Sequence, residues 1–501
     1  MSTYPVQLSR TAPVPRAKNA SYAKLFLGLF AALAIGFLLV QVIPESLLTV
    51  DTALVSVVAL ALFAYLTLPL AAGAKRAAGE DHMLLWAGIG LWSVLLIAER
   101  LFFRMSTIQS AYEGSFVASA YAEAMVWGVC FFALLIVSLR HPDYLRSLGS
   151  PAFRSLTLLA VFCVISSAYS PSPGFSLAWA MKFLLAVLVL RLIFTALADF
   201  SDLRRFLLAT LLSFLGLTVL CIAEALLSPD GLFRGDRLTE DVSPTGVSAI
   251  AAVLALLSLT FYFLEKRARY AVIALLGMAV MMIGGGKAAI LSAVIAGTLF
   301  FCLRRNLRSG LAFLGVVSAL SAVLVMATPL HRYISFYLTS GQADTATGRT
   351  ELWSYAAPRI LDAPLFGHGF SASKFISIEV DDLRWPAGHL HNGFLEVLYN
   401  NGILGLLLLL AFNIRIVRNL IWTIRQARTA ELRNLAVGAI SIYVFLIGNG
   451  MFNATFGGRP GSSYLMMIAL IVISEALRVL VVKQQHAAER QRVTILIGEG
   501  A

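Results

Sequence analysis

Long apolar blocks dominate this chain and leave it very few possible folds. Hydrophobic residues make up 59% of the 501 residues and charged residues only 13%, whereas soluble domains carry about 25% charged residues. The apolar residues fall in blocks of roughly 17–23, the length at which a helix crosses the ~30 Å hydrocarbon core of a bilayer. Backbone polar groups in lipid must be paired internally, so such blocks predict helices. We therefore expect an all-α polytopic membrane protein.

The pattern predicts about fourteen spans, or twelve to thirteen if two short ones around residues 284–286 form a tight hairpin. They are expected near residues 23–43, 52–72, 83–103, 117–139, 154–170, 175–197, 206–227, 244–264, 270–286, 288–303, 309–328, 393–413, 434–452 and 462–482. The predicted organisation is a flexible tail at 1–22, a membrane domain at 23–482 and a second tail at 483–501.

The distribution of Lys and Arg orients these spans. Basic residues of alternate short loops, among them Lys75-Arg76, Arg204-Arg205 and the arginines of 415–433, fall on one side together with both termini. By the positive-inside rule that side is cytoplasmic. The net charge of +12 is then mostly this orientation signal and contact with lipid headgroups, so no nucleic-acid partner is needed.

One outward loop, residues 329–392, is much longer than the others. Loops of this size are usually functional or disordered. This one has an amphipathic pattern and aromatic anchors, such as Trp353 and Trp385. We expect it to be ordered, to contain one or two helices and to lie on the periplasmic membrane surface.

Among the basic residues predicted on the outer face, where the orientation rule disfavours them, five are singled out: Arg234, Arg237, Lys287, Arg349 and Arg459. Guanidinium groups bind phosphate oxygens as a fork, and an ammonium group acts as a point charge. Convergence of these side chains would suit a pyrophosphate group.

Each of these residues also has a structural alternative. Arg234 and Arg237 could form a surface ion-pair loop with nearby acidic residues, as could Arg349. Lys287 could extend from a helix end toward the interface. The glycines at 284–286 could be a packing notch, or their backbone amides could favour an anion.

Two basic residues lie inside predicted spans, where charge is costly and is treated as functional by default. They are Lys182 and Arg191. Lys182 falls at a depth similar to that of Glu224, and a structural ion pair between them is the favoured interpretation.

His389 and His391 stand directly before the predicted span 393–413. Histidine is the side chain that most readily moves protons near neutral pH. No cysteine or clustered acidic pair accompanies them, so neither a metal site nor a cofactor is expected. His391 is the candidate proton acceptor, with a structural hydrogen-bonding role as the alternative. His389 is expected to be structural or substrate-binding, and His331 and His368 structural.

Four motifs give the chain a family resemblance. They are Thr347-Gly348-Arg349 with Leu352-Trp353, the sequence Pro-Leu-Phe-Gly-His-Gly-Phe at 364–370, His-Asn-Gly-Phe-Leu-Glu at 391–396, and Asn-Gly-Ile-Leu-Gly at 401–405. In order and spacing the set resembles the O-antigen ligase and Wzy-type polymerase superfamily, with the exopolysaccharide-production polymerases as the nearest branch. The resemblance covers roughly residues 230–410.

The resemblance implies a metal-independent, inverting glycosyltransferase of the bacterial inner membrane whose active site faces the periplasm. Its donor would be an oligosaccharide linked to undecaprenyl pyrophosphate, and other polysaccharide-assembly proteins are candidate partners. By motif, Arg349 and His391 correspond to the catalytic arginine and histidine. Arg237 matches less closely, because Pro-Thr follows where the family has Pro-Asn. Lys287 stands where the family often has arginine.

Three functions are consistent with these features. The first is polymerisation of lipid-linked repeat units of a surface polysaccharide or exopolysaccharide. The second is ligation of the glycan to lipid A-core. The third, more distant, is transport of a lipid-linked oligosaccharide, which the many spans and the intramembrane charges would allow.

Glu396 is expected to cap or orient the start of its helix.

Overall fold

The computed structural model describes residues 80–102, 127–128, 130–132, 134, 153–227, 233–234, 237–238, 243–304, 307–327, 349–376, 388–458 and 460–498. The predicted tail at 1–22, the first two predicted spans, His331 and Arg459 lie outside the described residues. Of the predicted span 117–139, only isolated helical residues are described.

Helices account for nearly all of the described chain, apart from one hairpin of two short strands. In chain order the elements are α3 (Glu80–Phe102), α7 (Arg154–Ser166), η3 (Ser167–Tyr169), α8 (Pro173–Ala196), α9 (Phe200–Leu227), β1 (Phe233–Arg234), β2 (Arg237–Leu238), α10 (Pro244–Glu265), α11 (Ala268–Gly284), α12 (Lys287–Arg304), α13 (Leu307–Ala327), α15 (Arg349–Asp362), η5 (Ala372–Phe375), α17 (Gly393–Gln426), α18 (Ala430–Gly450) and α19 (Ser462–Gly498).

Seven of the described helices are long and apolar enough to cross a membrane: α8, α9, α10, α12, α17, α18 and α19. Four others, α3, α7, α11 and α13, carry shorter apolar stretches. The prediction of an all-α, multi-pass membrane protein is thereby confirmed. The helices coincide with the predicted spans to within a few residues at most ends. The clearest difference is α19, which continues as a helix through the expected tail to Gly498.

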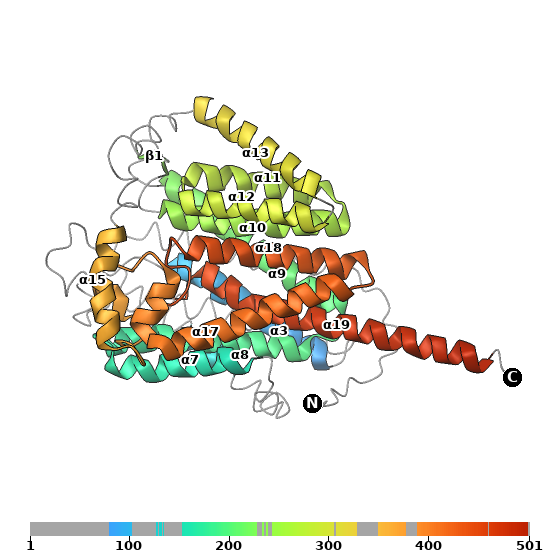
Figure 1. The fold of residues 1–501 in the computed structure, drawn as a ribbon, viewed down its shortest axis with the longest axis horizontal. Coiled ribbons are helices and arrows are strands. Elements are labelled where there is room, and N and C mark those ends of the chain that lie inside the picture. The colour runs from blue at the N-terminus through green and yellow to red at the C-terminus, as the bar shows by residue number, and fades with distance from the viewer. Residues whose placement is uncertain are drawn as a thin grey trace.

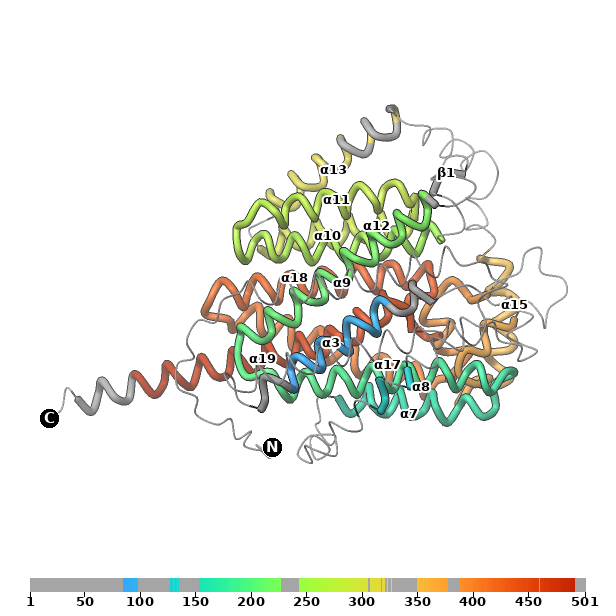
Figure 2. The backbone as a smooth tube through the Cα atoms, turned by 180° about the vertical axis from the view of Figure 1, so that it is seen from behind, coloured from blue at the N-terminus to red at the C-terminus, as the bar shows by residue number. Residues whose placement is uncertain are grey.

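The long helices run side by side as a bundle (Figure 1). α10 packs on α11, α12 on α18, and α17 contacts α7, α18 and α19. The amphipathic helix α15 lies at one end of the bundle, and α19 projects beyond the other end (Figures 1 and 2). The long loop therefore contributes an ordered helix at the end of the bundle that is farthest from the C-terminal end of α19.

The glycine turn between α11 and α12 is a packing notch. A Cβ at Gly284 would lie 2.4 Å from Ser248 Oγ, and one at Gly286 would lie 2.7 Å from Ser248 Cβ. The Gly286 amide donates a hydrogen bond to Ser248 Oγ at 3.0 Å. Of the two interpretations of these glycines, close helix packing is the one that the geometry supports, because Ser248 occupies the amide that an anion would need.

α17 is broken at Gly402, which adopts φ 61° and ψ −165°. Residues 364–369 supply hydrogen-bond partners to the backbone groups that are left unpaired at the break. The amides of His368 and Gly369 donate to the carbonyls of Tyr399 and Asn400 at 2.9 Å each. Backbone groups inside a membrane must be paired, and this loop supplies partners that the helix itself has lost.

The pairing runs in the other direction on the far side of the break. The amides of Ile403 and Leu404 donate to the carbonyls of Pro364 and Leu365, at 2.8 and 3.3 Å. Two of the four sequence motifs, 364–370 and 401–405, are thus halves of one backbone joint. This joint ties the outer loop to α17.

Candidate active site

The first motif places α15 against the histidine segment. Trp353 Nε1 donates a hydrogen bond to the Leu390 carbonyl at 2.8 Å. Leu352 is fully buried and belongs to a small apolar cluster with Leu390 and Tyr399. Apolar burial of this kind stabilises the contact by about 25 cal/mol per Å². The result is that Arg349, the first residue of α15, is brought to the same region as the two histidines.

The two histidine rings contact each other edge to face. Their centroids are 3.9 Å apart and the planes meet at 73°. His391 has φ +51°, a left-handed backbone conformation that is uncommon for residues other than glycine. Asn392 follows and caps α17, since its Oδ1 accepts hydrogen bonds from the amides of Phe394 and Leu395. The cap fixes the point at which the histidine segment enters the membrane helix.

Burial and positive charge keep both histidines neutral. Burial and then the Arg349 guanidinium lower the pKa of His391 to about 4. The pKa of His389 lies well below 6.5, because of burial first and then of His391, Lys374 and Arg349. Desolvation of the buried ring is the larger cause of the lowered pKa of His391, and the nearby guanidinium adds to it.

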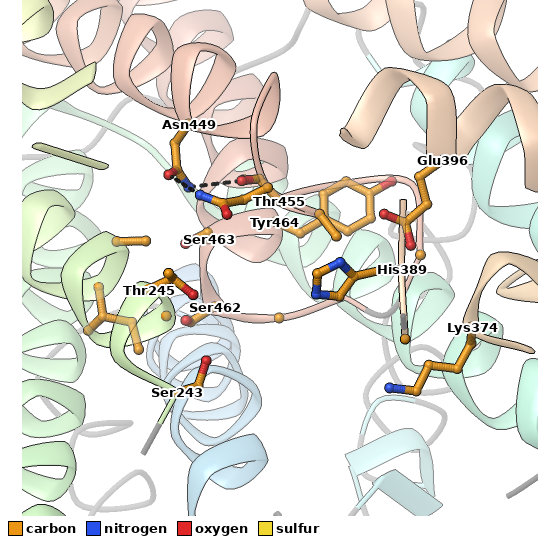
Figure 3. Close-up of a pocket in the computed structure, with 18 of the residues that line it drawn as sticks. Ser243, Thr245, Lys374, His389, Glu396, Asn449, Thr455, Ser462, Ser463 and Tyr464 are labelled. Atoms are coloured by element: carbon orange, nitrogen blue, oxygen red, sulfur yellow. Dashed lines mark hydrogen bonds between the residues drawn. The ribbon is translucent and has the colours of Figure 1, made fainter. Parts of the chain in front are cut away.

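A cavity of about 330 Å³ opens beside His389. Its walls come from the start of α10, η5, the histidine segment, α17 and the chain between α18 and α19. Figure 3 shows the His389 ring reaching into this space, with Lys374 and Glu396 on one side and the hydroxyls of Thr245 and Ser462 on the other. His389 lines the cavity, whereas His391 and Arg349 are not among its lining residues.

Glu396 does not cap the start of α17, contrary to the prediction from the sequence. The capping of α17 belongs to Asn392, while Glu396 Oε1 accepts a hydrogen bond from Ser373 Oγ at 3.0 Å. Glu396 is 4% exposed, and its second oxygen, Oε2, has no hydrogen-bond partner among the described residues. Its carboxylate lines the cavity. Glu396 is therefore part of the site rather than of the helix cap.

Lys374 was missed by the sequence argument. It lies in η5, lines the cavity and lowers the pKa of His389 through its charge. It is the only lysine in residues 329–392, and this was a signal that could have singled it out.

Of the other predicted pyrophosphate ligands, Lys287 has a described side chain, and it is not among the described residues that line the cavity. Lys287 is exposed at the first residue of α12. Arg234 and Arg237 face each other in the register of the hairpin β1–β2, and Arg459 lies outside the described residues. Their convergence on a phosphate group stays a prediction.

The remaining candidates have structural surroundings. His368 Nε2 lies 2.8 Å from the Arg359 carbonyl and its ring stacks against Tyr399, as a structural role predicts. Lys182 is fully buried, with Nζ 4.7 Å and 4.9 Å from the ring centroids of Trp127 and Trp179. Cation–π contacts of this kind compensate a buried charge. An ion pair between Lys182 and Glu224 stays a prediction.

Arg191 is 1% exposed, and its guanidinium lies 5.7 Å from the Phe153 ring centroid. Within the described residues no group of three or more His, Cys, Asp or Glu side chains is placed to hold a metal ion.

Comparison with known proteins agrees with the motifs. Residues 272–410 match the model of the Wzy_C family, described as O-antigen ligase. The matched segment runs from α11 through the break in α17, and it includes Arg349, His389, His391 and the joint around Gly402. No curated protein matches the chain.

The resemblance to the O-antigen ligase and Wzy-type polymerase superfamily is confirmed by this match. At the level of the family, the match supports a membrane glycosyltransferase-type polymerase or ligase, and the family implies lipid-linked oligosaccharides as substrates.

Proposed function

We propose that this protein transfers a glycan from undecaprenyl pyrophosphate to a sugar hydroxyl and so polymerises lipid-linked repeat units. The observation that carries the proposal is the meeting of Arg349, His391 and His389 beside one cavity. Two segments distant in sequence meet there, α15 and the histidine segment, and a hydrogen bond from Trp353 to the Leu390 carbonyl holds them together.

In the proposed step, the acceptor hydroxyl oxygen attacks the anomeric carbon of the donor sugar. The bond between that carbon and the pyrophosphate oxygen breaks, and the lipid pyrophosphate leaves with the electron pair. His391 takes the proton of the attacking hydroxyl, as a general base. Attack from the face opposite to the leaving group inverts the anomeric configuration.

Arg349 stabilises the negative charge that grows on the pyrophosphate. Donors that are fixed before the reaction are usually the largest catalytic contribution of this kind. The same guanidinium lowers the pKa of His391, so one residue serves both the leaving group and the neutral state of the base. The residues proposed here do this work without a metal ion.

Ligation to lipid A-core is the second candidate, and the description of the matched family favours it. The chemistry is shared and only the acceptor differs. Deletion of the gene, followed by gel analysis of surface glycans, separates the two. Loss of high-mass polysaccharide with normal lipopolysaccharide supports polymerisation. Loss of O-antigen bands with lipid-linked polymer retained supports ligation, and intact surface glycans would contradict both.

A purified-protein assay separates either transferase from a transporter. In detergent there is no second compartment, so chain growth from lipid-linked repeat units requires transfer chemistry. Absence of transfer, together with movement of the lipid across a reconstituted vesicle membrane, would favour the transporter.

We also propose an inner-membrane orientation with both termini in the cytoplasm and α15 in the periplasm. Two observations support it. α15 and the C-terminal end of α19 lie at opposite ends of the bundle (Figure 2). Basic contacts gather at the latter end, where Arg204 pairs with Glu265 and Lys483 Nζ donates to the Ala198 carbonyl.

Single-cysteine labelling of a cysteine-free variant tests this orientation. A membrane-impermeant reagent on intact spheroplasts should reach a cysteine placed at Ser340 and not one at Ser2. Labelling only at Ser2 would reverse the assignment of the active-site face.

A further inference from the structure

We infer that the cavity beside His389 is a pocket for the uncharged sugar of the acceptor glycan, anchored by the Glu396 carboxylate. The inference deepens the proposed function and rests on it for the word acceptor.

The polar lining of the cavity is the first argument. Among the described residues that line it, hydroxyl groups predominate, as on Ser243, Thr245 and Ser462, together with the side-chain amides of Asn449 and Asn453. Lys374, Glu396 and His389 are the other polar side chains of this described lining. Hydroxyl and amide groups suit an uncharged ligand rich in hydroxyls.

Glu396 supplies the second argument. Its carboxylate is buried, held by Ser373 through one oxygen, and its other oxygen has no partner among the described residues. A buried polar atom left without a partner costs free energy, so a native structure is expected to provide one when the ligand binds. A sugar hydroxyl would donate to this oxygen.

The opposite wall carries a relay of side chains that is already oriented. Asn453 Nδ2 donates to Asn449 Oδ1 at 2.8 Å, and Asn449 Nδ2 donates to Thr455 Oγ1 at 3.0 Å (Figure 3). Since Thr455 accepts in this chain, its hydroxyl proton remains to be donated elsewhere. An acceptor on one wall and a donor on the other is the arrangement that a sugar hydroxyl, both donor and acceptor, can bridge.

The approach of the two walls depends on glycine. A Cβ at Gly458 would lie 2.9 Å from Glu396 Oε1, and Gly457 has φ +101°. These glycines let the chain between α18 and α19 close over the carboxylate. The cavity volume of about 330 Å³ lies at the lower end of the roughly 300–1,000 Å³ typical of ligand pockets, which suits a single sugar unit rather than a long chain.

The acceptor is assigned to this pocket because His389 lines it, whereas the proposed pyrophosphate ligand Arg349 is not among its lining residues. The hydroxyl that loses its proton must reach the histidines, and a sugar held between Glu396 and Thr455 lies next to them.

Binding to the full chain in lipid nanodiscs tests the pocket without requiring activity. The probe is a lipid-free, phosphate-free oligosaccharide of one repeat unit, released by mild acid from the lipid-linked repeat units of the source bacterium. Calorimetry should show binding to the wild type. Glu396→Gln should weaken it at least tenfold and Thr455→Val at least threefold. The control Glu489→Gln, an exposed carboxylate on α19, should bind like the wild type.

Two variants on different walls keep the test decisive if one of them fails to fold. No binding to the wild type, or wild-type binding by both variants, would overturn the pocket. In transfer assays of the two variants, KM could rise for the lipid-linked donor and stay unchanged for added oligosaccharide acceptor. That result would show that the donor sugar occupies the pocket, which contradicts the acceptor assignment. If oligosaccharide binding depends on Glu396 but the protein has no transferase activity, the proposed function would be refuted and the pocket would stand.

Discussion

The pH dependence of transfer is the sharpest test of His391 as the base. Burial and Arg349 lower its pKa from 6.5 to about 4. That difference corresponds to about 3 kcal/mol disfavouring the protonated form. Because the pKa is lowered, the neutral and active form is the only one populated near pH 7, and it is lost only as the pH falls through about 4.

The expected profile follows from these values. At pH 5.5 a histidine with a pKa of about 4 is roughly 97% neutral, whereas an ordinary histidine with a pKa of about 6.5 is roughly 10% neutral. Turnover at pH 5.5 should therefore differ from turnover at pH 7.5 by no more than about 10%. With an ordinary histidine as the base, turnover would fall nearly tenfold between the same two pH values.

The assay is chain growth by purified protein from lipid-linked repeat units, scored on gels at saturating donor between pH 4 and pH 8. His486→Gln is the matched control, because His486 is exposed on α19 and its loss should leave the profile unchanged. A midpoint near pH 6.5 in the wild type would refute the reasoning, since it would place the essential base in an environment unlike that of His391.

Further predictions concern single residues. Arg349→Ala should abolish transfer and leave membrane insertion intact, and Arg349→Lys should recover only part, because a fork becomes a point charge; full activity of the lysine variant would contradict bidentate binding. His391→Ala should lose about 10²–10⁴-fold in rate and His389→Ala far less, while added chelator should change nothing. Gly402→Ala should destabilise the protein by about 1–3 kcal/mol or more in thermal unfolding, because φ +61° with ψ −165° is accessible essentially to glycine alone. The control Gly315→Ala, where a Cβ would meet nothing within 4 Å, should be close to neutral.

Helices were the predictable part of the fold. Apolar block length is a local property, so the limits of α10 (Pro244–Glu265) and α12 (Lys287–Arg304) lie within a few residues of the predicted spans. The ends that differ most are those of α17 and α19, which continue as helix past the predicted limits at 413 and 482. α19 continues past 482 because its sequence keeps helix-forming residues such as Lys, Gln, Ala and Glu, and hydrophobicity alone does not mark that end.

The site was predictable in its residues but not in its arrangement. The loop arginine and the histidine pair stood out because charge and titratable groups near a membrane helix are unusual. The role of Glu396 could not be read from spacing, since it depends on Ser373 and Gly458, which reach it from other segments. Lys374 likewise gains meaning only from the cavity that η5 helps to form.

Much of the motif set proves to be scaffold. Of the four motifs, 364–370 and 401–405 pair their backbones across the break in α17. The indole N–H of Trp353 donates to the Leu390 carbonyl. A straight membrane helix satisfies its own backbone and offers no attachment to an outer loop. A broken one exposes carbonyls and amides that the loop must meet in a single register. The break at Gly402 therefore fixes where the loop sits, and the cap at Asn392 fixes where the histidines sit on the same helix. Proton transfer and charge stabilisation both need donors held in place before the reaction, and α17 provides that by carrying both attachments.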